Sequence, residues 1–273
     1  MANGPIDTGT DQLLAEVKEG VAVITLNRPD ARNALSDTLT PALRQQIAEC
    51  AADPDVGALL ITGAGTAFCA GGDVKSMDSR PPTAVLSAAE KIDQLKQRQR
   101  TLTGALVAVR KPTVAALPGP AAGAGLAIAL ACDIRFAARS AFISTGYARV
   151  GLSGDYGIAW LLTRLVGTAK ARELMFTADR VDGETCQRIG LVNRLIEDAD
   201  LQAVAFDFTR TLAAGPAVAL RNMKENLDIA LTAPFLTALD GEAERLIETA
   251  QSADHREAVR AFVEKRQPNF TGR

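Results

Sequence analysis

Two short apolar stretches, each followed directly by a glycine-rich turn, constrain the fold of this chain more than any other feature. Residues 57–62 (GALLIT) lead into the glycine-rich segment 63–73, and residues 113–117 (TVAAL) lead into the turn at 118–125. Short, continuous apolar runs bounded by turn residues are typical of strands that are buried on both faces. Glycine and proline then end each strand. The pattern predicts an α/β protein with two tight turns that carry few side chains.

The remaining pattern predicts a β/α core followed by helices. Leu13–Val17 and Val21–Leu26 flank Glu19-Gly20 as a hairpin would. Ser36 is a candidate N-cap for a helix over Thr38–Ala52. A long helix is expected over Ala84–Val109, and an uncharged helix, buried all round, over Gly123–Cys132. Further strands are expected at Asp133–Ala137 and Ala141–Ser144, and helices at Ile158–Leu165, Ala169–Phe176, Gly183–Ile189, Ala203–Ala213, Pro216–Ile229, Ala233–Ala250 and Ser252–Lys265.

No Gly/Ser linker or charge run divides the 273 residues. We therefore expect a disordered lead-in over 1–11, a core over 12–200 and a helical C-terminal region over 201–273. The first residues lack the basic and apolar segments of a signal peptide. The longest apolar stretch, 121–132, is too short to span a bilayer. No membrane partner is expected.

Charge and histidine content exclude several classes of function. The 30 basic and 32 acidic side chains give a net charge of −2, which provides no electrostatic footprint for nucleic acid. His255 is the single histidine, so zinc sites built on two or three histidines are excluded and no metal is expected. Proton chemistry would therefore depend on a carboxylate, Tyr, Lys or Cys. Four well-separated cysteines indicate reduced, buried thiols and a cytoplasmic protein, with Cys69 as an alternative nucleophile.

The glycine-rich turns allow more than one interpretation. Neither Gly63-Ala64-Gly65 nor Gly123-Ala124-Gly125 has the third glycine of a dinucleotide fingerprint. Residues 151–155 (GLSGD) miss the last glycine of a hydrolase nucleophile elbow. Backbone N–H groups of Ala70 and Ala124, the latter at a helix start, could instead converge as an oxyanion hole. The alternative is that these small residues serve only tight packing.

The chain resembles the crotonase superfamily (enoyl-CoA hydratase/isomerase) over about residues 12–270. The resemblance depends on these segments: Thr25-Leu26-Asn27-Arg28-Pro29 with Asn33-Ala34-Leu35, residues 61–73, Lys111-Pro112 through Asp133, residues 162–167 and 171–174, Gly190-Leu191-Val192-Asn193, and residues 262–266.

The resemblance implies a spiral of ββα units followed by helices that pack homotrimers, or dimers of trimers. It implies an acyl-coenzyme A thioester as substrate, with no separate cofactor. The N–H groups of Ala70 and Ala124 would stabilise a thioester enolate. Lys265 and Phe270 match a C-terminal region that contacts coenzyme A, sometimes from a neighbouring subunit. The other expected binding residues are Arg28, Ala34, Ala70, Gly71, Asp73, Gly123 and Tyr147.

Departures from the family pattern favour an isomerase. Hydratases of the family use two glutamates, and this chain has Ala127 and Tyr147 at those positions. Asp155 is a carboxylate in the same region and is our candidate acid–base, although it could merely cap a helix near Tyr156. An atypical hydratase and a non-catalytic thioester-binding protein are the alternatives. Leu86, Ile92 and Leu95 on the helix at 84–100 are candidates for an acyl pocket, a core or a lid.

Overall fold

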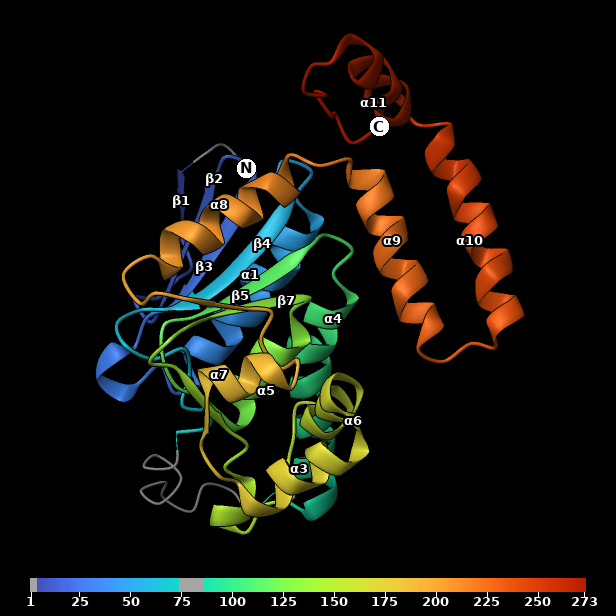
Figure 1. The fold of residues 1–273 in the computed structure, drawn as a ribbon. Helices are drawn as coiled ribbons and strands as arrows, with labels where there is room; N and C mark the ends of the chain where they lie inside the picture. Colours follow the sequence, from blue (N-terminus) through green and yellow to red (C-terminus); the bar gives the residue numbers. More distant parts are fainter. Residues whose placement is uncertain (1–3, 74–85) are drawn as a thin grey trace.

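A computed structural model describes residues 4–73 and 86–273 of the chain (Figure 1). Within these residues the main element is a seven-stranded sheet of order β1-β2-β3-β4-β5-β7-β10. Its first three strands are antiparallel, and β3, β4, β5, β7 and β10 are parallel. The strands are β1 (Gly4–Ile6), β2 (Leu13–Lys18), β3 (Val21–Leu26), β4 (Ala58–Gly63), β5 (Thr113–Leu117), β7 (Ile134–Ala138) and β10 (Arg194–Ile196).

The expected buried strands lie at the centre of this sheet. Every residue of β4 and β5 is buried, which explains their continuous apolar sequences. In β2, buried and exposed residues alternate, as expected of a hairpin strand with one face on the core. The predicted hairpin is confirmed, with Leu13 opposite Leu26. The α/β fold class is therefore confirmed.

The first residues differ from the expectation. We expected disorder over 1–11, but Gly4–Ile6 forms β1, which pairs antiparallel with β2. The expectation is wrong for these residues, because a strand of three residues with one large apolar side chain gives too weak a pattern to detect. Three further short strands were missed: β6 (Ala121–Ala122), β9 (Val181–Asp182) and β10. The first two join β8 (Phe142–Ser144) in a small second sheet.

Helices cover the sheet and complete the core. Eight of the nine residues of α5 are buried, as its uncharged sequence predicts. The helix expected over Ala84–Val109 is divided: α3 begins after the Ser87 cap, and a π-turn (η2) precedes α4. Residues 84 and 85 lie outside the described residues. The helical elements of the core are η1 (Pro29–Ala31), α1 (Leu39–Ala52), α3 (Ala88–Gln99), η2 (Arg100–Gly104), α4 (Ala105–Ala108), α5 (Gly123–Ala131), η3 (Tyr147–Val150), α6 (Ile158–Thr177), α7 (Gly183–Arg188) and α8 (Leu201–Ala213).

Two predicted helix signals are partly confirmed. The Ser36 hydroxyl accepts the Leu39 N–H at 2.9 Å, although α1 begins at Leu39 and not at Thr38. The two helices expected at 158–165 and 169–176 both form; they make up α6 and meet at a kink at Gly167, whose φ of +75° and ψ of 168° are not helical. A glycine is required there because side chains disfavour this backbone conformation.

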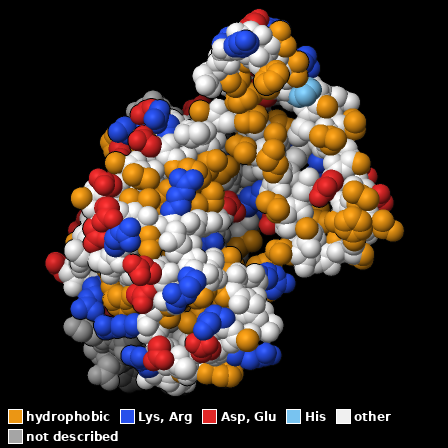
Figure 2. Space-filling model, in the orientation of Figure 1, with side chains coloured by type: hydrophobic (Ala, Val, Ile, Leu, Met, Phe, Trp, Pro, Cys, Tyr) orange, Lys and Arg blue, Asp and Glu red, His pale blue; other side chains and the backbone are white. Residues whose placement is uncertain are grey.

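The last three helices form an arm beyond the core: α9 (Ala217–Ala230), α10 (Phe235–Ala250) and α11 (Ala253–Glu264) (Figure 1). By contrast, α8 packs on β4 and β5 and is part of the core. Figure 2 shows hydrophobic side chains gathered on the arm. Its apolar residues that are more than half exposed include Met223, Leu227, Phe235, Leu236, Leu246, Ile247, Phe262 and Val263. Among the described residues, no helix combines the length and apolar character needed to cross a bilayer.

Candidate active site

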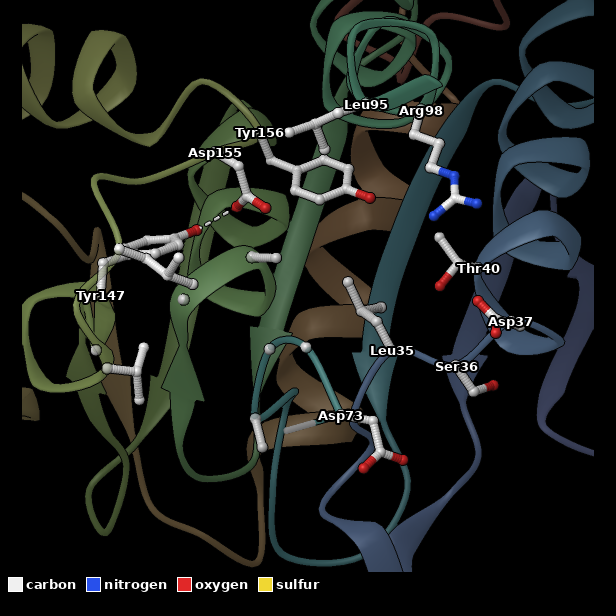
Figure 3. Close-up of a pocket in the computed structure, with 18 of the residues that line it drawn as sticks. Leu35, Ser36, Asp37, Thr40, Asp73, Leu95, Arg98, Tyr147, Asp155 and Tyr156 are labelled. Carbon is white, nitrogen blue, oxygen red and sulfur yellow. Dashed lines mark hydrogen bonds between the residues drawn. The ribbon is translucent and has the colours of Figure 1, made fainter. Parts of the chain in front are cut away.

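A cavity of about 530 Å³ lies where the two glycine-rich turns meet (Figure 3). Helices α1 and α3 supply one side, and η3 with the loop before α6 supplies the other. Turn 70–73 and the start of α5 lie between them. The described lining residues are Leu35, Ser36, Asp37, Thr40, Pro41, Arg44, Ala70, Gly71, Gly72, Asp73, Leu95, Arg98, Gly123, Ala124, Gly146, Tyr147, Val150, Leu152, Asp155 and Tyr156.

The two turns approach each other so closely that only glycine fits at Gly71. A Cβ at this position would lie 2.7 Å from the Ala122 carbonyl oxygen and 3.4 Å from the Ala124 nitrogen. Its φ of +87° also disfavours any other residue. A bridge between Cys69 and Ala121 joins the turns. The two glycine-rich turns therefore lie side by side in the structure.

The start of α5 presents unpaired donors to the cavity. The helix begins at Gly123, so the N–H groups of Gly123 and Ala124 lie in its first turn and have no intrahelical acceptor. Both residues line the cavity. The helix dipole adds a partial positive charge there. A developing negative charge beside Ala124 would therefore be stabilised.

The expectation that the Ala70 N–H is a free donor is wrong. The Cys69 carbonyl accepts the Ala122 N–H at 2.9 Å, on the α5 side. In a trans peptide, the carbonyl and the following N–H point in opposite directions. The Ala70 N–H therefore points away from α5, and it donates to the Arg32 carbonyl at 2.9 Å.

The same rule identifies Gly72 as the available donor of this turn. The Gly71 carbonyl accepts the Leu35 N–H at 2.8 Å, so the Gly72 N–H points away from Leu35. Among the described residues, no acceptor takes the Gly72 N–H. Gly72 lines the cavity. Sequence spacing could not reveal this, because the choice between neighbouring N–H groups depends on which carbonyls are paired.

Asp155 is half-buried on the cavity wall and is bonded to Tyr147. The Tyr147 hydroxyl donates to Oδ1 of Asp155 at 2.5 Å (Figure 3). Burial raises the pKa of Asp155 above its ordinary value of 3.8, and the Tyr147 hydrogen bond opposes that rise. Burial, together with the Asp155 charge, raises the pKa of Tyr147 far above 10, so its hydroxyl stays a neutral donor. Among the described residues, none donates to Oδ2 of Asp155.

Other roles weighed for these positions are not supported. Helix α6 begins at Ile158 with Gly157 as N-cap and without a side-chain cap bond, so Asp155 does not cap it. Burial raises the pKa of Cys69 to about 12, which leaves the thiol unreactive as a nucleophile. The buried Asn33 amide donates to the carbonyls of Ala64 and Ala67, so a protein side chain occupies the inside of the first glycine loop.

The predicted binding residues fall into three groups. The first group lines the cavity: Ala70, Gly71, Asp73, Gly123 and Tyr147. Arg28 lies just outside the lining: its guanidinium donates to the Ala34 carbonyl at 2.6 Å and pairs with Asp73 at 3.1 Å. Asp73 therefore lines the cavity and also holds Arg28 beside it.

Two predicted binding residues lie apart from the cavity. Lys265 ends α11 and Phe270 follows it, both on the C-terminal arm (Figure 1).

The single histidine, His255, is exposed on α11. Among residues 4–73 and 86–273, no cluster of three or more His, Cys, Asp or Glu could hold a metal ion.

Sequence reasoning missed one end of the cavity. Thr40 and Arg44 lie one turn apart on α1, and Arg98 lies on α3. Of the three apolar residues named on the helix at 84–100, only Leu95 lines the cavity, and Ile92 is 53% exposed. The i, i+4 spacing of Thr40 and Arg44 could have indicated a shared helix face, but not which face meets the cavity.

The chain is similar to known proteins over almost its whole length. The profile of the family described as enoyl-CoA hydratase/isomerase matches residues 16–273. A 1,2-epoxyphenylacetyl-CoA isomerase of Escherichia coli is 34% identical over 96% of this chain and 98% of its own length. A short-chain-enoyl-CoA hydratase of Clostridium acetobutylicum is 33% identical over 91% and 94%. The crystal structure of an enoyl-CoA hydratase from Polaromonas superposes with a TM-score of 0.87 at 29% identity, covering 95% of this chain and 99% of the other.

Proposed function

The chain belongs to the enoyl-CoA hydratase/isomerase family of acyl-CoA enzymes, and from this premise we propose that it is an isomerase with Asp155 as its acid and base. The observation that carries the proposal is the Tyr147–Asp155 pair on the cavity wall. The Tyr147 hydroxyl keeps its proton and donates a hydrogen bond to the Asp155 carboxylate, which can accept a proton from the substrate. That pair is suited to moving a proton between two carbons of one substrate.

The oxyanion hole of this proposal uses Gly72 and Ala124. Both residues line the cavity, and neither N–H has an acceptor among the described residues. Two donors on one thioester oxygen lower the free energy of the enolate that forms when a proton leaves the adjacent carbon. A single donor of this kind contributes about 10²–10³ in rate. Asp155 can then return the proton to another carbon.

The absence of a glutamate at the cavity argues against the usual hydration of a double bond. Ala127 is completely buried within α5, and its methyl group can neither orient nor deprotonate water. Tyr147 is kept protonated by its raised pKa. No glutamate is among the described residues that line the cavity. Because relatives include a named hydratase, hydration that uses Asp155 alone is the second candidate.

The test compares the two reactions in one experiment. Purified protein is incubated with 3-enoyl-CoA and 2-enoyl-CoA thioesters of several chain lengths, and the conjugated thioester absorbance is followed. Conversion of 3-enoyl to 2-enoyl thioesters, lost in Asp155→Asn, supports the proposal. Rapid loss of absorbance from 2-enoyl thioesters supports the hydratase. Calorimetric binding of acyl-CoA without turnover of any substrate would favour a non-catalytic protein.

We also propose that the arm packs the chain into a homotrimer or a dimer of trimers. Nine large apolar side chains on its three helices are more than half exposed, and covering them would remove apolar surface from water. Lys265 and Phe270 would then meet the cavity of a neighbouring subunit. Sedimentation equilibrium tests this, and a monomer at micromolar concentration would contradict it. The cytoplasmic location remains a prediction based on the four buried cysteines.

A further inference from the structure

The cavity ends in a positively charged cluster that the proposed chemistry does not use. Arg44 on α1, Arg98 on α3 and the Tyr156 hydroxyl form this cluster, which we call the arginine end. Figure 3 shows the Arg98 guanidinium and the Tyr156 hydroxyl directed into the same space above Thr40. Tyr156 is the residue that follows Asp155. The arginine end and the proposed acid–base therefore belong to one continuous wall.

The two guanidinium groups lack carboxylate partners. Across residues 4–73 and 86–273, neither Arg44 nor Arg98 forms an ion pair, and Nε of Arg44 is buried without any hydrogen-bond acceptor. The cavity carboxylates are engaged elsewhere: Asp73 pairs with Arg28, Asp155 accepts from Tyr147, and Asp37 is itself partnered. A buried donor left unpaired destabilises the fold unless a ligand satisfies it.

The position of Tyr156 is fixed by its own contacts. Its N–H donates to Oε1 of Gln99 at 2.7 Å, and its φ of +51° is unusual for a residue with a side chain. Burial raises the pKa of the Tyr156 hydroxyl, and the charge of Arg44, a hydrogen bond that Arg44 donates to the hydroxyl and the charge of Arg98 oppose that rise. The hydroxyl therefore lies within electrostatic reach of both guanidinium groups, as a neutral donor beside two cations.

We propose that the arginine end binds a carboxylate at the far end of the acyl group, so that the preferred substrates are ω-carboxyacyl thioesters. This inference rests on the proposed function: if Asp155 acts on the acyl carbons, the groups around the next residue contact the acyl chain beyond those carbons. Arginine suits the task because its planar fork pairs with both carboxylate oxygens. Leu95 is the described apolar residue that α3 adds to the lining, so this end offers little to a long alkyl tail.

The test measures binding, which does not depend on turnover. Isothermal titration calorimetry compares succinyl-CoA with butyryl-CoA, glutaryl-CoA with pentanoyl-CoA, and adipoyl-CoA with hexanoyl-CoA, each pair having equal chain length. We expect about tenfold or stronger binding of the carboxylate member for at least one length, because hydrogen bonds to charged groups are among the strongest. Equal affinity within all three pairs would overturn the inference while leaving the proposed isomerase intact.

Variants separate the acyl carboxylate from the phosphates of coenzyme A. Arg44→Gln and Arg98→Gln should abolish the preference yet change butyryl-CoA binding by less than about threefold. Arg44→Lys should keep part of the preference, since it keeps the charge but not the fork. Arg172→Gln, an exposed arginine on α6, is the matched control and should change nothing. In the contrary outcome, the variants weaken the binding of every thioester equally and weaken the binding of CoA more than that of 3′-dephospho-CoA. That result would show that the arginines bind phosphate and would overturn the inference.

Discussion

Replacing Asp155 with asparagine should remove catalysis while leaving the shape of the site unchanged. Asparagine has the same size, and its amide oxygen can still accept the Tyr147 hydroxyl that now lies 2.5 Å from Asp155. It cannot accept a proton from carbon. Loss of a general base typically costs about 10²–10⁴ in kcat. This corresponds to about 3–5 kcal/mol in the activation free energy.

The same substitution should increase stability at neutral pH. Burial raises the pKa of Asp155 in the folded protein above its ordinary value. Folding therefore favours the protonated form, and the wild type loses stability as pH rises through the pKa of the folded state. Asparagine does not titrate. The gain in melting temperature of Asp155→Asn over the wild type should thus be smallest near pH 3 and should increase towards pH 7.

The two readouts are measured on one set of preparations. Stopped-flow absorbance of the conjugated thioester gives kcat and KM, and differential scanning fluorimetry between pH 3 and pH 8 gives the melting temperatures. Asp200→Asn, an exposed carboxylate before α8, is the control and should be neutral in both. Full turnover by Asp155→Asn would refute the assignment of the base. A stability difference that shrinks as pH rises would refute the role of burial.

Four other outcomes test separate parts of the site. Tyr147→Phe should raise the pKa of Asp155 further, because the hydrogen bond that lowers it is lost, and the acid limb of kcat/KM should move to higher pH. Ala124→Pro should lower kcat by about 10²–10³ in stopped-flow assays with little loss of fold, since proline is tolerated in the first helical turn. Gly71→Ala should destabilise the protein by about 1–3 kcal/mol in urea titrations, because its Cβ would lie 2.7 Å from the Ala122 carbonyl oxygen. Isomerisation in D₂O, followed by mass spectrometry, should leave part of the product without deuterium if Asp155 carries the proton alone; complete incorporation in the first turnover would contradict a single shielded base.

The parts of the fold that could be predicted are those whose side chains make a strong local pattern. β4 and β5 are buried on every side, and α5 is apolar all round, so their sequences admit few alternatives. β6 and β9 have two residues each and carry no periodicity. The π-turn at Arg100–Gly104 leaves no trace in composition, because it depends on how α3 meets the core. These features depend on tertiary packing that a single sequence does not display.

The side chains of the site were easier to predict than its backbone. Tyr147 stood out because it occupies a position where a glutamate was expected, and Asp155 because it is a carboxylate in the same region. The structure brings the two side chains together. The choice of Ala70 failed because a backbone donor has no residue-type signal. Whether the N–H of Ala70 or of Gly72 is free depends on the carbonyls of Cys69 and Gly71, which are paired across the chain to Ala122 and Leu35.

The pairing of Tyr147 with Asp155 also explains how one carboxylate can suffice. Burial alone raises the pKa of an aspartate, which makes its carboxylate a stronger base but reduces the fraction that is ionised. The Tyr147 hydroxyl counters this by donating to the carboxylate, and its own raised pKa prevents it from giving up the proton. Burial thus increases the basicity of Asp155 towards a proton on carbon, and the hydrogen bond opposes the accompanying loss of the ionised form. Ala127 offers no carboxylate at its place in the core, so in the proposed isomerisation Asp155 alone takes a proton from one carbon and returns it to another.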